Sequence, residues 1–304
     1  MKKLPWILFA AGVILGAVFF FPFRVFTTQI EQALAKQAGI DAQLGDLRIG
    51  TGLGLGLGRG GVTALRGTNV VLNFAEGRTI TCKEFVLSPQ FWTLVMAKIR
   101  VTAACKTERD GTLISVVSAG PIWNPSQVDG EIFIQDLKLS FLENLLHLDS
   151  FSGTLNGQVG FQMPLNKGPR IPALNWEATG SKVTLPALAS DLLNVPSISV
   201  GRLSTRGKVS SSGRADIEEF VIGDKNSPIE GNFQGNFTLD RRGMPTGADI
   251  KGRLRTDPEF EKAQLKDISL DLLFGKANET GQREFHKMAQ GSLLGLIMNP
   301  PLDR

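Results

Sequence analysis

Two stretches of the chain alternate apolar and polar residues with a period of two and carry glycines at matching positions. Residues 151–161 read FSGTLNGQVGF, and residues 229–239 read IEGNFQGNFTL. Successive side chains of a β-strand point to opposite faces, so one face of each stretch is made of apolar residues and glycine. The apolar residues are Phe151, Leu155, Val159, Phe161, Ile229, Phe233, Phe237 and Leu239. The pattern predicts half-buried antiparallel strands, and these side chains are the candidate apolar groove face.

Further strands are predicted before the first of these stretches. Residues 62–74 and 78–87 predict one hairpin, and residues 98–106 and 112–119 predict another. Between the hairpins, Ser88-Pro89 predicts the start of a short apolar helix that covers the sheet.

A glycine-rich stretch, GTGLGLGLGRGG at residues 50–61, is better explained by a strand than by a phosphate-binding loop. A P-loop needs a Lys-Ser/Thr pair after its glycines, and none follows here. The alternation instead places leucine on one face of a strand and glycine on the other.

Near the C-terminus, the polar residues 284–290 predict a short helix, and the apolar residues 292–302 predict a closing strand. We therefore expect residues 41–304 to form a mainly β domain. Its fold would be an elongated, curved antiparallel sheet, either a groove or a sandwich, with a few short helices. The proline- and glycine-rich residues 120–130 are where two lobes of this domain would meet.

The N-terminus predicts the compartment. Residues 4–23 carry no charge, and a helix of about 20 residues spans roughly 30 Å, the thickness of the bilayer core. Lys2 and Lys3 precede this run, which favours a cytoplasmic N-terminus. We expect a cytoplasmic stub and transmembrane anchor at 1–26, an amphipathic linker helix at 27–40, and the rest of the chain in the periplasm. A cleaved signal peptide is the alternative, although its apolar core is shorter and ends in small residues.

Composition argues against nucleic-acid binding and offers no catalytic motif. The net charge is +4, both signs are interspersed, and no block of lysine and arginine would follow a phosphate backbone. His147 and His286 have no nucleophile motif around them, and two cysteines and two histidines form no zinc pattern. We expect no catalytic residues, no metal and no cofactor.

The cysteines, Cys82 and Cys105, both follow the expected anchor. An oxidising periplasm would permit a disulfide between them. Two buried free thiols are the alternative.

The chain resembles the type II secretion system protein N family, in its longer form. The resemblance rests on the anchor, on GTGLGLGLGRGGVTAL (50–65), on KEFVLSPQFWTLVMAKIRVTA (83–103), on SGTLNGQVGF and EGNFQGNFTL, and on the apolar stretch before Pro300. It implies a single-pass inner-membrane protein of Gram-negative bacteria with a periplasmic β-rich domain. Such a protein would be an accessory subunit in protein export across the outer membrane, with other secretion-system subunits as partners.

The strand pattern is also similar to AsmA-like proteins, whose repeating β-grooves carry lipids along an apolar trough. This similarity implies a second function, the binding or transfer of phospholipid or another lipid. An anchored β-sandwich scaffold without a ligand is the third interpretation.

Overall fold

The structure is a computed structural model of the chain. It describes residues 28, 31–32, 35–36, 41–45, 48–50, 64–73, 79–107, 111–121, 123, 126–141, 151–165, 171–190, 193–240, 245–265 and 270–290. These residues are mainly β, as the alternation predicts, and their paired strands run antiparallel. The chain divides into two compact units: unit 1 comprises residues 1–90 and 102–108, and unit 2 comprises residues 91–101 and 109–304.

Three predicted segments fall outside the described residues. They are the anchor at 1–26, most of the glycine-rich strand at 50–61, and the closing strand at 292–302. Within the described part of the chain, no helix combines the length and the apolar character needed to cross a bilayer. The linker helix predicted at 27–40 is described only at residues 28, 31–32 and 35–36, which are helical.

Unit 1 is built on the hairpin predicted from residues 62–74 and 78–87. This hairpin is confirmed as β3 (Ala64–Asn73) and β4 (Thr79–Pro89), and the short strands β1 (Asp41–Leu44) and β2 (Arg48–Gly50) both pair with β3. Leu44, Val70 and Cys82 face one another across β1, β3 and β4, and all three are buried. This row of side chains forms the core of unit 1.

A disulfide joins Cys82 on β4 to Cys105 on β5 (Ile99–Thr107). The two Cα atoms are 5.3 Å apart, and 23 residues separate the cysteines in sequence. Both cysteines are buried in unit 1, so the link is shielded from solvent.

The disulfide should contribute substantially to the stability of unit 1. A loop of this length restricts the unfolded chain by an amount worth about 3 kcal/mol. We expect the paired change Cys82→Ser and Cys105→Ser to lower the free energy of unfolding of unit 1 by about 2–4 kcal/mol, measured by denaturant titration. The wild-type chain under reducing conditions should match the double variant. Equal stability of the oxidised and reduced chains would contradict this role.

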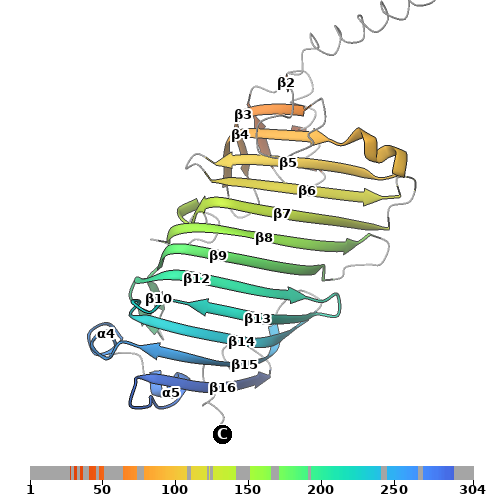
Figure 1. Ribbon diagram of the computed structural model, residues 1–304. Helices are drawn as coiled ribbons and strands as arrows, with labels where there is room; N and C mark the ends of the chain where they lie inside the picture. Colours follow the sequence, from red (N-terminus) through yellow and green to blue (C-terminus); the bar gives the residue numbers. More distant parts are fainter. Residues whose placement is uncertain are drawn as a thin grey trace, which may run out of the picture. The chain divides into compact units, whose positions relative to one another are not determined.

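Unit 2 holds a long sheet in which neighbouring strands follow one another in sequence (Figure 1). The order is β6-β7-β8-β9-β12-β13-β14-β15-β16, and each strand pairs antiparallel with the next. The bounds are β6 (Thr112–Gly120), β7 (Gln127–Lys138), β8 (Ser152–Pro164), β9 (Ala173–Leu185), β12 (Ile198–Val209), β13 (Arg214–Ile222), β14 (Ile229–Leu239), β15 (Pro245–Thr256) and β16 (Gln282–Gln290). The short strands β10 (Leu188–Ser190) and β11 (Leu193–Val195) pair separately. The stretches predicted as strands at 151–161 and 229–239 are confirmed as β8 and β14.

Two short α-helices connect β15 to β16. The first, α4 (Pro258–Gln264), begins after Asp257, whose carboxylate accepts hydrogen bonds from the backbone N–H groups of Glu259 and Phe260. The second is α5 (Leu270–Phe274). The helix predicted at 284–290 is wrong, because these residues belong to β16 and pair with β15 along their length. Alternation of Phe285 and Lys287 with Glu284 and His286 suits a strand with one buried face.

The short helix predicted after Ser88-Pro89 exists as the 3₁₀ helix η2 (Phe91–Met96), but it begins later than predicted. Ser88 and Pro89 are the last residues of β4. In this helix the side chains of Leu94, Val95 and Met96 are exposed to solvent, so its second half does not cover the sheet. A 3₁₀ helix of this length makes few turns, and Ala97, with a φ angle of 54°, ends it.

Candidate functional site

One face of the unit 2 sheet carries apolar residues across strand after strand. The strand register defines rows of side chains that cross β8, β9, β12, β13, β14, β15 and β16 on this face, which we call the apolar face. One row is Gly157, Ala178, Thr205, Phe220, Phe233, Gly252 and Phe285. The next row is Val159, Trp176, Gly207, Ile217, Gly235, Ile250 and Lys287. On the other side of β8, Val159 faces Ile132 of β7, so the face extends there too.

Two β-bulges keep the apolar residues in these rows. On β13 the register shifts between Ile217 and Phe220, so both side chains lie on the apolar face although three positions separate them. Glu218 and Glu219, which together oppose the single residue Gln234 in this bulge, form ion pairs with Arg206 at 3.3 and 3.8 Å. A similar shift on β7 follows Ile134.

The residues predicted as the groove face have two different environments. At one margin of the face, Phe151, Leu155 and Ile229 pack against a buried cluster and therefore belong to an ordinary core. This cluster consists of Leu139, Val183, Ile198, Val200, Leu265 and Leu270. Leu265, which follows α4, and Leu270, the first residue of α5, bring the helices into this cluster.

All eight predicted residues are half-buried, and the other five lie farther from this margin: Val159, Phe161, Phe233, Phe237 and Leu239. By register, Val159 lies beside Trp176, Phe161 beside Leu174, and Phe237 beside Ala248. Leu239 ends β14 opposite Pro245. The structure thus brings much of the predicted face together and leaves its middle partly accessible.

Glycines let aromatic rings lie directly against the backbone of this face. A Cβ atom on Gly207 would come within 2.4 Å of the Trp176 ring, and a Cβ on Gly252 within 2.8 Å of the Phe233 ring. The Trp176 ring is further held by a hydrogen bond of 3.1 Å from its indole N–H to the Thr205 hydroxyl. Glycine at these two positions therefore leaves room for the Trp176 and Phe233 rings on the apolar face.

An apolar pocket of about 490 Å³ opens on this face between β13 and β16. Phe233 contacts the rings of Phe220 and Phe285 with centroids 5.8 and 5.7 Å apart, and Phe285 contacts Phe274 of α5 at 5.0 Å. These rings line the pocket together with Ile217, Gln234, Gly235, Ile250, Leu273 and Lys287. Such tilted aromatic contacts are favourable beyond the area that they bury.

Arg283 of β16 fastens both connecting helices beside this pocket. Its guanidinium donates to the carboxylates of Glu261 on α4 (2.8 and 3.1 Å) and Asp271 on α5 (2.9 and 3.1 Å), and to the hydroxyl of Thr256 at 2.9 Å. The Arg283 side chain is only 4% exposed, so the charge depends on these partners. The network fixes where α5 places Phe274 on the pocket.

Lys287 is a buried cation of the pocket wall, only 5% exposed. Burial lowers the pKa of its ammonium group from the ordinary value of 10.5 because desolvation disfavours the charged form.

The titration of Lys287 should make stability depend on pH. In the pH range below 10.5 the unfolded chain holds this proton more tightly than the folded chain, so the free energy of unfolding rises as pH increases towards 10.5. We expect Lys287→Met to lose this component, because methionine does not titrate. Denaturant unfolding at a series of alkaline pH values measures the slope for both chains. Identical slopes would contradict the assignment.

The opposite face of the same sheet is polar. Exposed ion pairs join neighbouring strands there, such as Arg253 with Glu284 at 2.9 Å and Arg255 with Glu230 at 3.0 Å. His286 lies 2.6 Å from Asp249, which gives this histidine a carboxylate partner. His147 lies outside the described residues. Such exposed pairs contribute little stability, but they keep this face in water and the other face towards apolar contacts.

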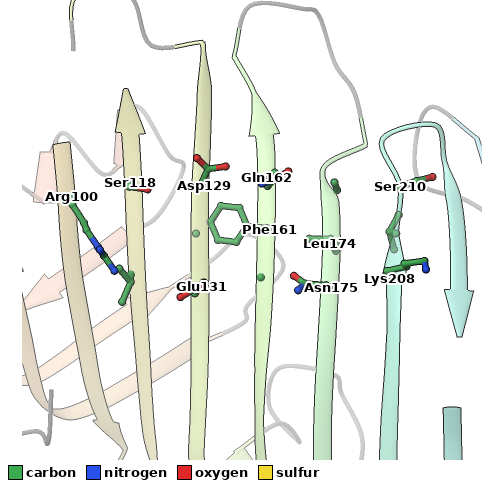
Figure 2. A pocket seen from close by; sticks show the side chains of 15 residues that line it. Arg100, Ser118, Asp129, Glu131, Phe161, Gln162, Leu174, Asn175, Lys208 and Ser210 are labelled. Atoms are coloured by element: carbon green, nitrogen blue, oxygen red, sulfur yellow. The ribbon is translucent and has the colours of Figure 1, made fainter. Parts of the chain in front are cut away.

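A hollow of about 600 Å³ lies over β6, β7, β8, β9 and β12. Figure 2 shows the side chains that line it. It carries charges of both signs, with Arg100 and Lys208 on one hand and Asp129 and Glu131 on the other. Several of its polar groups already have partners within the chain. Gln127 donates a hydrogen bond to Asp129, and Lys208 pairs with Glu218 at 3.3 Å. The described residues contain no group of acidic, histidine and cysteine side chains that could hold a metal ion.

Sequence reasoning missed most of the pocket wall and a tryptophan of the apolar face beyond the pocket. Trp176, Phe220 and Phe285 were not assigned to the face, although each lies in a strand with partial alternation. Phe220 reaches the row of Phe233 through the bulge on β13, for which a single sequence gives no clear signal, and Trp176 and Phe285 are placed by the pairing of β9 with β8 and of β16 with β15.

Comparison of the chain with protein-family models, with curated proteins and with solved structures finds no match.

Proposed function

We propose that unit 2 binds the acyl chains of lipids along its apolar face, with the phenylalanine-lined pocket as the deepest part of the site. The observation that carries this proposal is the run of half-buried apolar rows across β8 to β16, backed by a charged face on the other side of the same sheet. A sheet with one apolar face must cover that face with protein or with an apolar ligand.

The chemistry of the face suits a hydrocarbon chain. The pocket volume of about 490 Å³ lies within the range of about 300–1,000 Å³ that is typical of small-molecule sites. Each methylene group that leaves water for this surface would contribute about 0.8 kcal/mol. Phospholipid is the ligand that this proposal favours, with its acyl chains on the apolar face and its headgroup in solvent.

A photo-crosslinker placed on this face should capture lipid. We expect Phe237→benzoylphenylalanine, in the full chain in cell membranes, to form phospholipid adducts on irradiation, detected by mass spectrometry. Thr238→benzoylphenylalanine is the matched control, because the next residue of β14 points to the polar face. Equal labelling at both positions, or none at residue 237, would count against a lipid site.

A charge in the pocket should displace the ligand. We expect Phe233→Glu to reduce lipid capture at residue 237 by at least about tenfold, since a carboxylate beside a hydrocarbon chain loses its hydration. Asn232→Glu, on the opposite face of β14, should leave capture unchanged. Circular dichroism separates loss of ligand from loss of fold. If Phe233→Glu unfolds unit 2, the milder Phe233→Asn variant takes its place, and unchanged capture there would contradict the site.

The second candidate function is that of an accessory inner-membrane subunit of the type II secretion system, held by one N-terminal membrane helix with the β-rich domain in the periplasm. Its support is the resemblance of the sequence. Residues 83–103 carry part of that resemblance, and they fold as β4, η2 and β5 in the order strand, short helix and strand that their sequence predicts.

Deletion of the gene in its Gram-negative host tests this second candidate. Secreted enzymes should accumulate in the periplasm of the deletion strain, measured by activity in periplasmic and external fractions, and the wild-type gene should restore export. Normal export would contradict the secretion function. Complementation with the Phe233→Glu variant then shows whether export depends on the apolar face.

A further inference from the structure

The exposed hydrophobic side chains of unit 2 gather where several neighbouring strands begin or finish, at one end of the strands of its sheet. Val95 of η2 is 92% exposed and Trp123 of the β6–β7 connection is 78% exposed. The other exposed hydrophobic residues at these strand ends are Leu94, Met96, Ile99, Met163 and Leu165. We call this set the apolar rim. Among large hydrophobic residues in the described parts of the chain, only Met288 is exposed elsewhere.

Strand pairing places these segments next to one another. Gly120 ends β6 against Lys98, because a Cβ atom there would lie 2.9 Å from the Lys98 side chain. Gly120 pairs with Gln127 at the start of β7, and Gln127 pairs with Pro164 at the end of β8. The Leu165 backbone N–H then donates to the Ser126 carbonyl at 2.9 Å. In Figure 1, η2, which follows β4, accordingly lies on the same side of the sheet as the arrowheads of β6 and β8.

The turn that carries Val95 buries its polar residue and exposes its aliphatic residues. The backbone N–H groups of Ala97 and Lys98 donate to the carbonyls of Leu94 and Thr93 at 2.9 and 3.0 Å. Thr93 is buried, whereas the aliphatic residues that follow it face solvent. A water-facing turn would place its polar residue outside, so this turn is suited to an apolar environment.

The chemistry of the rim matches the interface of a bilayer. It combines aliphatic side chains with a tryptophan, and the only charged residues in the sequence from Phe91 to Val101 are Lys98 and Arg100. Tryptophan prefers the headgroup level, and lysine and arginine favour anionic lipid surfaces. The apolar N-terminal stretch at residues 4–23, where a membrane anchor is expected, would keep the domain within reach of such a surface.

The rim also leads onto the apolar face. Met163 lies on the same side of β8 as Phe161 and Val159, and Val128 of β7 faces it. A hydrocarbon chain could therefore pass from the rim to the middle of the face along apolar side chains.

From these observations we infer that the apolar rim inserts into the headgroup region of a phospholipid bilayer and is the entrance through which acyl chains reach the apolar face. The entrance role rests on the proposed lipid function, whereas the insertion can be measured by itself. Protein contacts at the rim, with a partner or with a second copy of the chain, are outcomes that the test distinguishes.

The test uses a spin label at Val95→Cys in the full chain, reconstituted in vesicles of phosphatidylcholine and phosphatidylglycerol. The native cysteines are joined in the disulfide, so the new thiol is the one labelled. Electron paramagnetic resonance compares collisions of the label with oxygen, which enriches in bilayers, and with a water-soluble nickel chelate. We expect oxygen collisions to dominate at residue 95. Asn226→Cys is the matched control, because it lies exposed in the β13–β14 turn at the opposite ends of the strands, and its label should favour the chelate.

A water-exposed label at residue 95 would overturn the insertion, and so would a label shielded from both reagents, which indicates a protein contact. Lipid capture at residue 237 is measured separately and reports on the proposed function. Lipid capture at residue 237 without bilayer insertion at residue 95 would refute only the proposed role of the rim. Insertion at residue 95 without lipid capture at residue 237 would refute only the proposed acyl-chain site.

Discussion

The separation of apolar and charged side chains onto opposite faces of one antiparallel ladder is the constraint on which unit 2 depends. A shift of register by one residue would move Phe233 and Val159 to the charged face, so the pairing is strongly specified. The bulge on β13 keeps the rows aligned, and the glycines beneath Trp176 and Phe233 leave room for these rings. The helices α4 and α5 depend on the same sheet through Arg283, which reaches both from β16.

Alternation alone predicted the class of fold, because a period of two is the direct signature of a strand with one buried face. It predicted β8 and β14 well, since each stretch alternates over its whole length. It failed for residues 284–290, whose polar composition hid a strand. Helix starts were less predictable. Ser88-Pro89 has the signature of a helix start but ends β4, whereas Asp257-Pro258 has the same signature and does begin α4. Tertiary pairing decides between two such sites, and local sequence does not contain it.

The candidate site was predictable only in part, because the alternation of apolar and polar residues shows which side chains share a face and not what packs against them. The residues of the face could be chosen from the pattern, but their division between a closed core and an accessible surface could not. Phe151, Leu155 and Ile229 are covered by residues as distant in sequence as Leu265 and Leu270. Beyond that margin the half-buried face continues towards the exposed rim, so the buried cluster and the rim lie at opposite ends of the strands. The proposed membrane docking and the proposed acyl-chain binding are compatible with this arrangement, since docking uses the rim and acyl-chain binding uses the face.

The most direct test of the account is to measure the phospholipid that stays bound to the purified full chain, by quantitative mass spectrometry. Comparison of the wild type with Val159→Glu isolates the apolar face, because both chains carry the same N-terminal stretch and any lipid held there is common to both. Gln158→Glu, on the other side of β8, controls for the added charge. The account predicts that the wild type and Gln158→Glu retain stoichiometric lipid that folded Val159→Glu has lost. Equal lipid content in all three folded chains would show that the apolar face is not a lipid site.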